Sequence, residues 1–143
     1  MYTTVQLGKI LAMKRSLDLE LAGLVCAFHD VYSLHTGEWE SHGPKAESYV
    51  REITAEYNER WGMKLGNILD DEVELIITAI HGHSDKEIVT ENAYAELLKD
   101  VDSLDAYLHG FEVQKGSGRA KRLIHTFREL GLRDTALSEL EGI

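Results

Sequence analysis

The dominant pattern along the chain is helical, because apolar residues recur at intervals of three and four positions. The clearest segment runs from Glu72 to His81, where Val73, Ile76, Ile77 and Ile80 fall at i, i+3, i+4 and i+7. This spacing is typical of a helix that turns one apolar stripe toward a core. The same period predicts a shorter opening helix containing Val5, Ile10 and Leu11, and further helices over about Asp18 to Tyr32, Gly43 to Trp61, Glu91 to His109, Arg119–Leu130 and Asp134–Leu140.

No segment shows the strict apolar and polar alternation, bounded by turn pairs, that indicates a half-buried strand. A chain of 143 residues also suits one domain. The sequence therefore predicts an all-α, single-domain helical bundle of about six to seven helices over residues 1–143. Its core spans about residues 5–110, and C-terminal helices occupy 119–141. The polar stretches between helices are His35–Ser41, Leu65–Asp70, Ser84–Thr90 and Lys115–Gly118.

The charge balance narrows the range of partners. Fifteen Lys and Arg stand against 25 Asp and Glu, which gives a net charge of −10. A nucleic-acid duplex or an anionic membrane requires a positive field, so neither is expected as the main partner. A single cysteine, Cys26, cannot build a disulfide framework or a thiolate zinc site. No apolar run has the length of a signal peptide or a spanning helix, so a cytoplasmic location is expected.

Two of the histidine-containing motifs lie at the ends of predicted helices. His29-Asp30 follows an apolar run, and its carboxylate must be either solvated or paired with a strong cation. His81-Gly82-His83 follows the stripe that ends at Ile80. Each motif also has a structural interpretation: an exposed helix end for the first, and a favourable interaction of histidine with a helix C-terminus for the second.

Three aspartates within six residues, Asp100, Asp102 and Asp105, interrupt an apolar stripe. A solvated acidic face is expected for Asp100 and Asp105, and less so for Asp102, which directly follows a residue of the stripe. His42 opens the helix that has Pro44 in its first turn. The remaining histidines (His35, His109 and His125) carry weaker signals, and His109 and His125 are expected to be structural. Trp39 and Tyr32 are expected to cover the core rather than to bind a base.

Taken in order, these motifs resemble the HD-domain metal-dependent phosphohydrolases. The resemblance rests on His29-Asp30, His42-Gly-Pro-Lys-Ala, Ala79-Ile-His-Gly-His83-Ser and Asp100-Val-Asp102-Ser-Leu-Asp-Ala, and it runs from about Val5 to Leu108. It implies an HD-like fold with metal ligands at His29, Asp30, Asp102, His42 and His83; His81 is a weaker match. In one respect the chain departs from the family pattern: the family has a histidine on its first helix, whereas no histidine precedes His29 here.

The resemblance also implies a reaction. One or two divalent ions (Fe, Mn, Co, Ni, Zn or Mg) would activate a water for attack on the phosphorus of a nucleotide or another small phosphate ester. Asp30, His83 and Lys45 are the expected catalytic residues, and Lys45, with Arg119 or Lys121, would offset the charge of the phosphate. The alternatives are a degenerate HD-like domain that binds a metal, a nucleotide or a protein without turnover, and a plain interaction bundle whose histidines are all structural.

Overall fold

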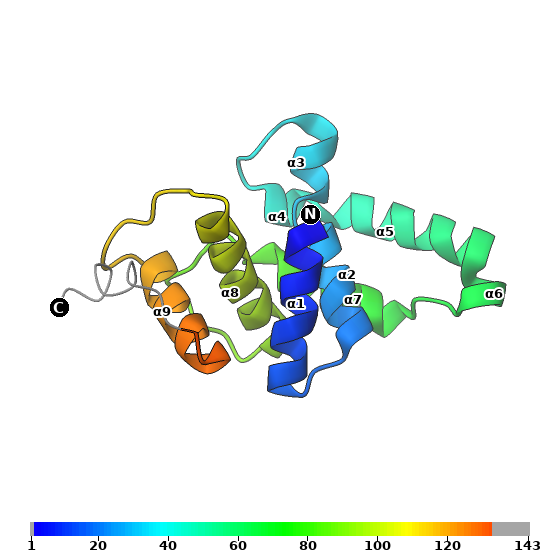
Figure 1. Ribbon diagram of the computed structural model, residues 1–143. Coiled ribbons are helices and arrows are strands. Elements are labelled where there is room, and N and C mark those ends of the chain that lie inside the picture. Colours follow the sequence, from blue (N-terminus) through cyan, green and yellow to red (C-terminus); the bar gives the residue numbers. More distant parts are fainter. Residues whose placement is uncertain (1, 133–143) are drawn as a thin grey trace.

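The computed structural model describes residues 2–132. These residues form nine α-helices and a π-helical turn, without a strand (Figure 1). The predicted all-α class is therefore confirmed. The helix predicted over Asp134–Leu140 lies outside the described residues. The elements are α1 (Tyr2–Arg15), α2 (Leu19–Phe28), α3 (Val31–Thr36), α4 (His42–Lys45), α5 (Glu47–Tyr57), η1 (Asn58–Gly62), α6 (Met63–Leu65), α7 (Asp70–His81), α8 (Ala93–Leu108) and α9 (Gly118–Leu130).

Three of the predicted boundaries are wrong in ways that matter for the site. The opening helix is not short, since α1 has 14 residues. The helix predicted over Asp18 to Tyr32 is divided into α2 and α3 at Asp30, whose φ of −108° and ψ of 13° lie outside the helical region. The helix predicted over Gly43 to Trp61 is divided into α4, α5 and η1. An apolar stripe can continue through such a break, so its period does not reveal the break.

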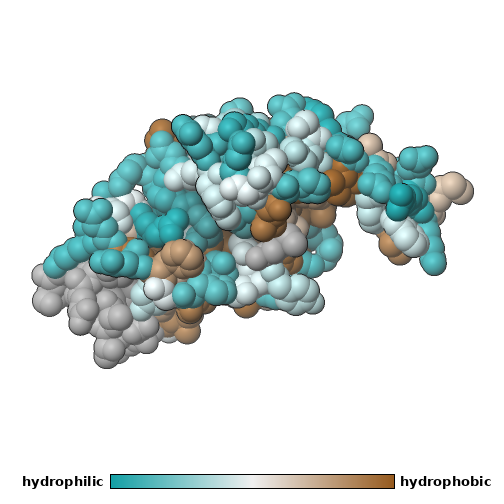
Figure 2. Space-filling model, turned by 90° about the horizontal axis from the view of Figure 1, so that it is seen from above, coloured by the Kyte–Doolittle hydropathy of each residue, from teal (hydrophilic) through white to brown (hydrophobic). Residues whose placement is uncertain are grey.

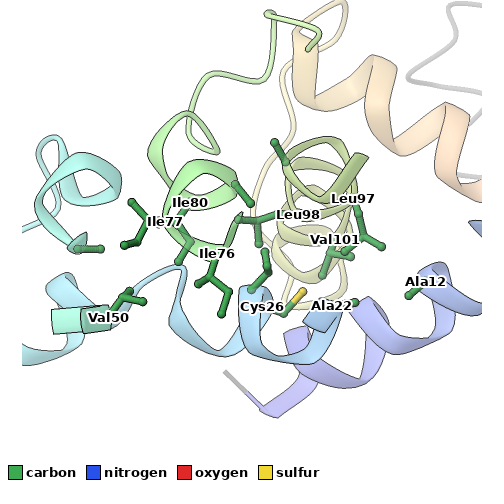
Figure 3. Packing of buried hydrophobic residues seen from close by; sticks show 14 of the residues in the cluster. Ala12, Ala22, Cys26, Val50, Ile76, Ile77, Ile80, Leu97, Leu98 and Val101 are labelled. Carbon is green, nitrogen blue, oxygen red and sulfur yellow. The ribbon is translucent and has the colours of Figure 1, made fainter. Parts of the chain in front are cut away.

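The core lies between α1, α2, α7 and α8, which pack against one another. Figure 3 shows Ile76 and Ile80 of α7 facing Leu98 and Val101 of α8 across the cluster. Helices α1 and α2 approach closely because Gly8 has no side chain there. A Cβ at Gly8 would lie 2.5 Å from the sulfur of the buried Cys26. These four helices form the rigid body on which the candidate site is built.

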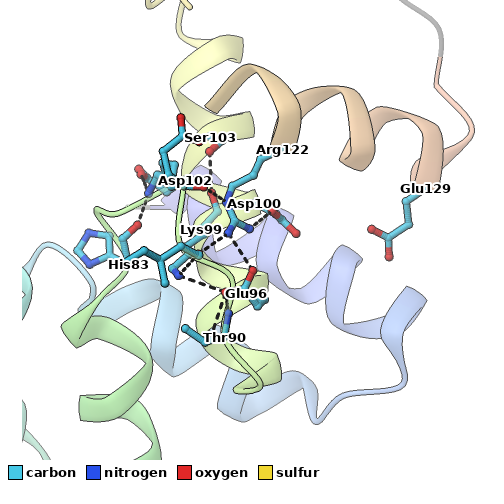
Figure 4. A network of polar contacts seen from close by, with 12 residues as sticks. His83, Thr90, Glu96, Lys99, Asp100, Asp102, Ser103, Arg122 and Glu129 are labelled. Carbon is cyan, nitrogen blue, oxygen red and sulfur yellow. Dashed lines mark hydrogen bonds and ion pairs between the residues drawn. The ribbon is translucent and has the colours of Figure 1, made fainter. Parts of the chain in front are cut away.

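A buried ionic network joins α9 to this body (Figure 4). The Asp100 carboxylate of α8 accepts hydrogen bonds from Arg15 of α1 at 2.7 Å and from Arg122 of α9 at 2.8 Å. Asp100 is only 4% exposed, so the expectation that it lies on a solvated face is wrong. The two guanidiniums supply the charge that allows a carboxylate to be buried here.

Helices α5, η1 and α6 extend away from the rest of the molecule as an arm (Figure 1), and the same projection is visible from above in Figure 2. Trp61 and Met63 are exposed on this arm. Among the described helices, none is long and apolar enough to cross a membrane.

Candidate metal centre

Four of the predicted site residues are brought together, and each lies at the end of a helix. His29 follows the last residue of α2, and Asp30 precedes the first residue of α3. His42 is the first residue of α4, and His83 lies just beyond α7. The break between α2 and α3 frees Asp30 from helical geometry, so that adjacent His29 and Asp30 reach one point.

The Asp30 carboxylate is at the middle of this group. Its Oδ2 lies 3.0 Å from Nε2 of His29, and its Oδ1 lies 3.1 Å from Nε2 of His42 and 3.8 Å from Nε2 of His83. The Nε2 atoms of His42 and His83 are themselves 3.0 Å apart. Asp30, His42 and His83 each offer one ligand atom within a group no wider than 4.8 Å, which is compact enough to surround one ion.

The hydrogen bonds behind the rings decide what these atoms can do. Nδ1 of His29, His42 and His83 each lies 2.7–2.8 Å from a backbone carbonyl oxygen, which can only accept. Each Nδ1 therefore carries the proton, and in the neutral ring each Nε2 presents a lone pair. With all three rings neutral, three nitrogen lone pairs and two carboxylate oxygens face one another, whereas a ring that gains a proton at Nε2 donates it to Asp30. This donor set fits a metal ion, and the carbonyl behind each ring is the usual support of a ligand histidine.

The local electrostatics favour the ionised form of the Asp30 carboxylate. Burial raises the pKa of Asp30, but the hydrogen bonds and charges of His29 and His83 outweigh it, so the pKa ends far below its usual range. Burial lowers the pKa of His29, yet the Asp30 carboxylate more than compensates and the pKa ends above its ordinary value. At His83 burial dominates and the pKa ends below its ordinary value. Burial therefore favours the uncharged form of His83, which is the form that binds a metal.

Asp102 lies beside this group but belongs to a different contact. Its Oδ2 is 2.5 Å from Nζ of Lys86 and 3.5 Å from Nη2 of Arg119. Burial raises the pKa of Asp102, and the Lys86 ammonium outweighs burial and lowers it overall. Lys86 also donates to the backbone carbonyl of His83, which links Asp102 to the histidine group (Figure 4). Sequence reasoning missed Lys86, whose one signal is its position three residues after His83.

The other candidates lie around the centre. Lys45 is 3.5 Å from Glu38 and lies over the ring of Tyr32 at 5.2 Å from its centroid. Tyr32 is half-buried against the core, as expected. Trp39 is 60% exposed and meets His42 edge-on with ring centroids 5.9 Å apart, so the expectation that it covers the core is wrong. The histidines outside the group are all exposed: His35, His81, His109 and His125.

A family model described as HD domain matches residues 1–107. The match covers every residue of the histidine group and Asp102, and it ends before α9. No curated protein and no solved structure matches the chain.

Proposed function

The chain belongs to the HD-domain family, and we propose that it is a metal-dependent phosphohydrolase acting on a nucleotide or another small phosphate ester. The observation that carries the proposal is the convergence of the ligand atoms of Asp30, His42 and His83 on one point. These donors suit a divalent cation, and the family to which the chain belongs generally binds divalent metals.

We assign Asp30, His42 and His83 as ligands of one ion. His29 lies beside the other oxygen of Asp30. Together with Asp102, His29 would hold a second ion or complete the ligand set of the first. Mixed imidazole and carboxylate donors suit Fe, Mn, Co, Ni or Zn better than Mg, which prefers oxygen ligands. When bound, such an ion lowers the pKa of a water and polarises a phosphoryl oxygen.

The protein supplies orientation and charge. Asp30 directs one oxygen to His29 and the other to His42, which supports a role in positioning the attacking water. His83, which is 2% exposed, forms the buried side of the site. Lys45 is exposed one turn after His42 and is paired with Glu38 at 3.5 Å. We assign it to offset a phosphate charge, for which its ammonium would exchange Glu38 for the phosphate. The metal and this lysine together would hold an anion on a chain of net charge −10.

The test begins with the metal content of protein purified without a chelator. Hydrolysis is then measured on p-nitrophenyl phosphate, bis(p-nitrophenyl) phosphate and a set of nucleoside monophosphates. Asp30→Asn and His42→Gln should weaken metal binding and lower turnover together, whereas His81→Gln, which changes an exposed histidine two residues from His83, should retain both. The proposal would be refuted if the wild-type protein is purified without metal and shows no turnover after metal is added. Activity that survives Asp30→Asn would also refute it.

The second candidate is an HD-like domain that binds a metal, a nucleotide or a partner without turnover. The ion pair between Lys86 and Asp102 favours it, since an ammonium already satisfies a carboxylate that the family would use for metal. Stoichiometric metal binding with no hydrolysis across the substrate set would support this candidate over the first.

A further inference from the structure

Arg119 reaches the candidate centre from outside the part of the chain that the family model matches. It lies in the first turn of α9, and the match ends at residue 107. Its Nη2 is 3.5 Å from Oδ2 of Asp102. Lys86 contacts the same oxygen and donates to the backbone carbonyl of His83. Helix α9 therefore places a guanidinium at the edge of a site otherwise built from α2, α4, α7 and α8.

The Arg119 guanidinium has unused hydrogen-bonding capacity. An arginine carries five N–H donors, yet among the described residues the polar contact of Arg119 is the single one to Asp102, at the long distance of 3.5 Å. Arg122, one turn further along the same helix, is different. It contacts Asp100, Glu96 and the carbonyls of Lys86 and Ile88 at 2.8–3.0 Å.

Two positive charges, those of Lys86 and Arg119, lie beside the single negative charge of Asp102. Lys86 is nearly buried, lies 2.5 Å from the carboxylate, and thus matches its single negative charge. Arg119 adds a second positive charge, and its side chain is 33% exposed, so it is accessible to a ligand. Lys121, on the same helix, is paired with Glu87 at 3.4 Å and is more exposed. Of the two α9 cations expected to meet a phosphate, Arg119 is the one that contacts Asp102.

We propose that Arg119 binds the phosphate group of the substrate and so completes the site from α9; this inference rests on the proposed function. A guanidinium with free donors matches two phosphate oxygens in a forked arrangement, which an ammonium cannot reproduce. The residue would bind the phosphate directly while Lys86 keeps Asp102 in place. The site would then depend on a helix that the family match does not include.

The experiment measures phosphate binding and hydrolysis separately. Inorganic phosphate is titrated calorimetrically into the full chain with stoichiometric Mn²⁺, for wild type, Arg119→Gln, Arg119→Lys and Arg60→Gln. Arg60 is an exposed arginine on the arm, paired with Glu56, and serves as the charge-matched control. Arg119→Gln should weaken phosphate binding by roughly 10- to 100-fold, as expected for a charge-assisted contact, and Arg119→Lys should restore only part of it. Mn²⁺ affinity and the melting temperature should remain those of wild type.

The outcomes separate this inference from the proposed function. If wild type does not hydrolyse any ester but Arg119→Gln loses phosphate binding, the inference holds and the hydrolase assignment fails. If wild type is active and Arg119→Gln has unchanged phosphate affinity and KM, the hydrolase assignment holds and the inference is overturned. Loss of Mn²⁺ binding in Arg119→Gln, or no phosphate binding by wild type, also overturns it.

Discussion

The two histidines that follow helix α7 offer a test of the metal centre that requires no substrate. His83 is buried, its Nε2 is 3.0 Å from that of His42, and its Nδ1 donates to the carbonyl of Ile80. His81 is exposed and lies outside the group. The substitutions His83→Gln and His81→Gln therefore make the same chemical change two residues apart, and only the first removes a donor from the centre.

The expected size of the effect follows from the number of donors. Removing the hydrogen-bond partner of a metal ligand lowers metal affinity by about 10- to 100-fold. Removing one of three ligand atoms should therefore lower it by at least about 100-fold. A metal at about 1,000 times its Kd stabilises the wild-type fold by about 4.1 kcal/mol. The same concentration would be about 10 times the Kd of His83→Gln and would stabilise it by only about 1.4 kcal/mol. At about 3 °C per kcal/mol for a chain of this size, the metal-induced rise in Tm should shrink by about 8 °C.

The assay is a thermal melt of each protein with and without Mn²⁺, Zn²⁺ or Ni²⁺. The quantity compared is the rise in Tm that the metal produces. This rise is independent of the stability that His83→Gln loses through its broken hydrogen bond. His81→Gln should show the wild-type rise. Equal rises in all three proteins would refute the assignment of His83 as a ligand and the lone-pair argument on which it rests.

Three further outcomes test the packing that holds the centre. Asp100→Asn should lower the free energy of unfolding, measured by urea denaturation, by about 3 kcal/mol, because Arg15 and Arg122 lose the carboxylate charge that they share. Asp105→Asn on the same helix should lower it by less than about 1 kcal/mol. Equal losses would contradict the ionic network around Asp100. Gly43→Ala should lower the free energy of unfolding by about 1–3 kcal/mol and weaken metal binding, as measured by calorimetry. The reason is that its Cβ would lie 2.7 and 2.8 Å from backbone oxygens of α7. Gly82→Ala meets open space and should change neither quantity. Burial raises the pKa of Cys26 to about 12, so a thiol reagent should label it in denaturant and not in the folded chain; rapid labelling of the native protein would contradict its burial.

The helices could be predicted from the sequence because their apolar stripes are local. The stripe that contains Ile76 and Ile80 marks α7 without reference to any other segment. The burial of Asp100 could not be predicted in this way, since its partners lie 85 residues before it and 22 residues after it in the chain. Lys86 was missed for a related reason: its partner Asp102 lies on a different helix, and no local pattern pairs the two.

In the candidate site, too, the local features could be predicted and those that depend on the fold could not. The residue types of the centre could be named from the motifs, but the way Asp30 divides its two oxygens between His29 and the pair His42 and His83 depends on where α2 stops. Exposure of Trp39 was also missed, because an aromatic residue in a loop has no period from which its burial can be deduced.

The distance between His42 and His83 is set by backbone packing. Gly43 lies against the carbonyls of Ile80 and His81, so close that a Cβ would meet both oxygens. Helix α4 can therefore rest directly on the end of α7, which brings the two Nε2 atoms to 3.0 Å. A larger residue at position 43 would push α4 outward and separate the rings even if every ligand were retained. The glycine that follows His42 is thus as much a part of the centre as the histidines, although it donates no atom to it.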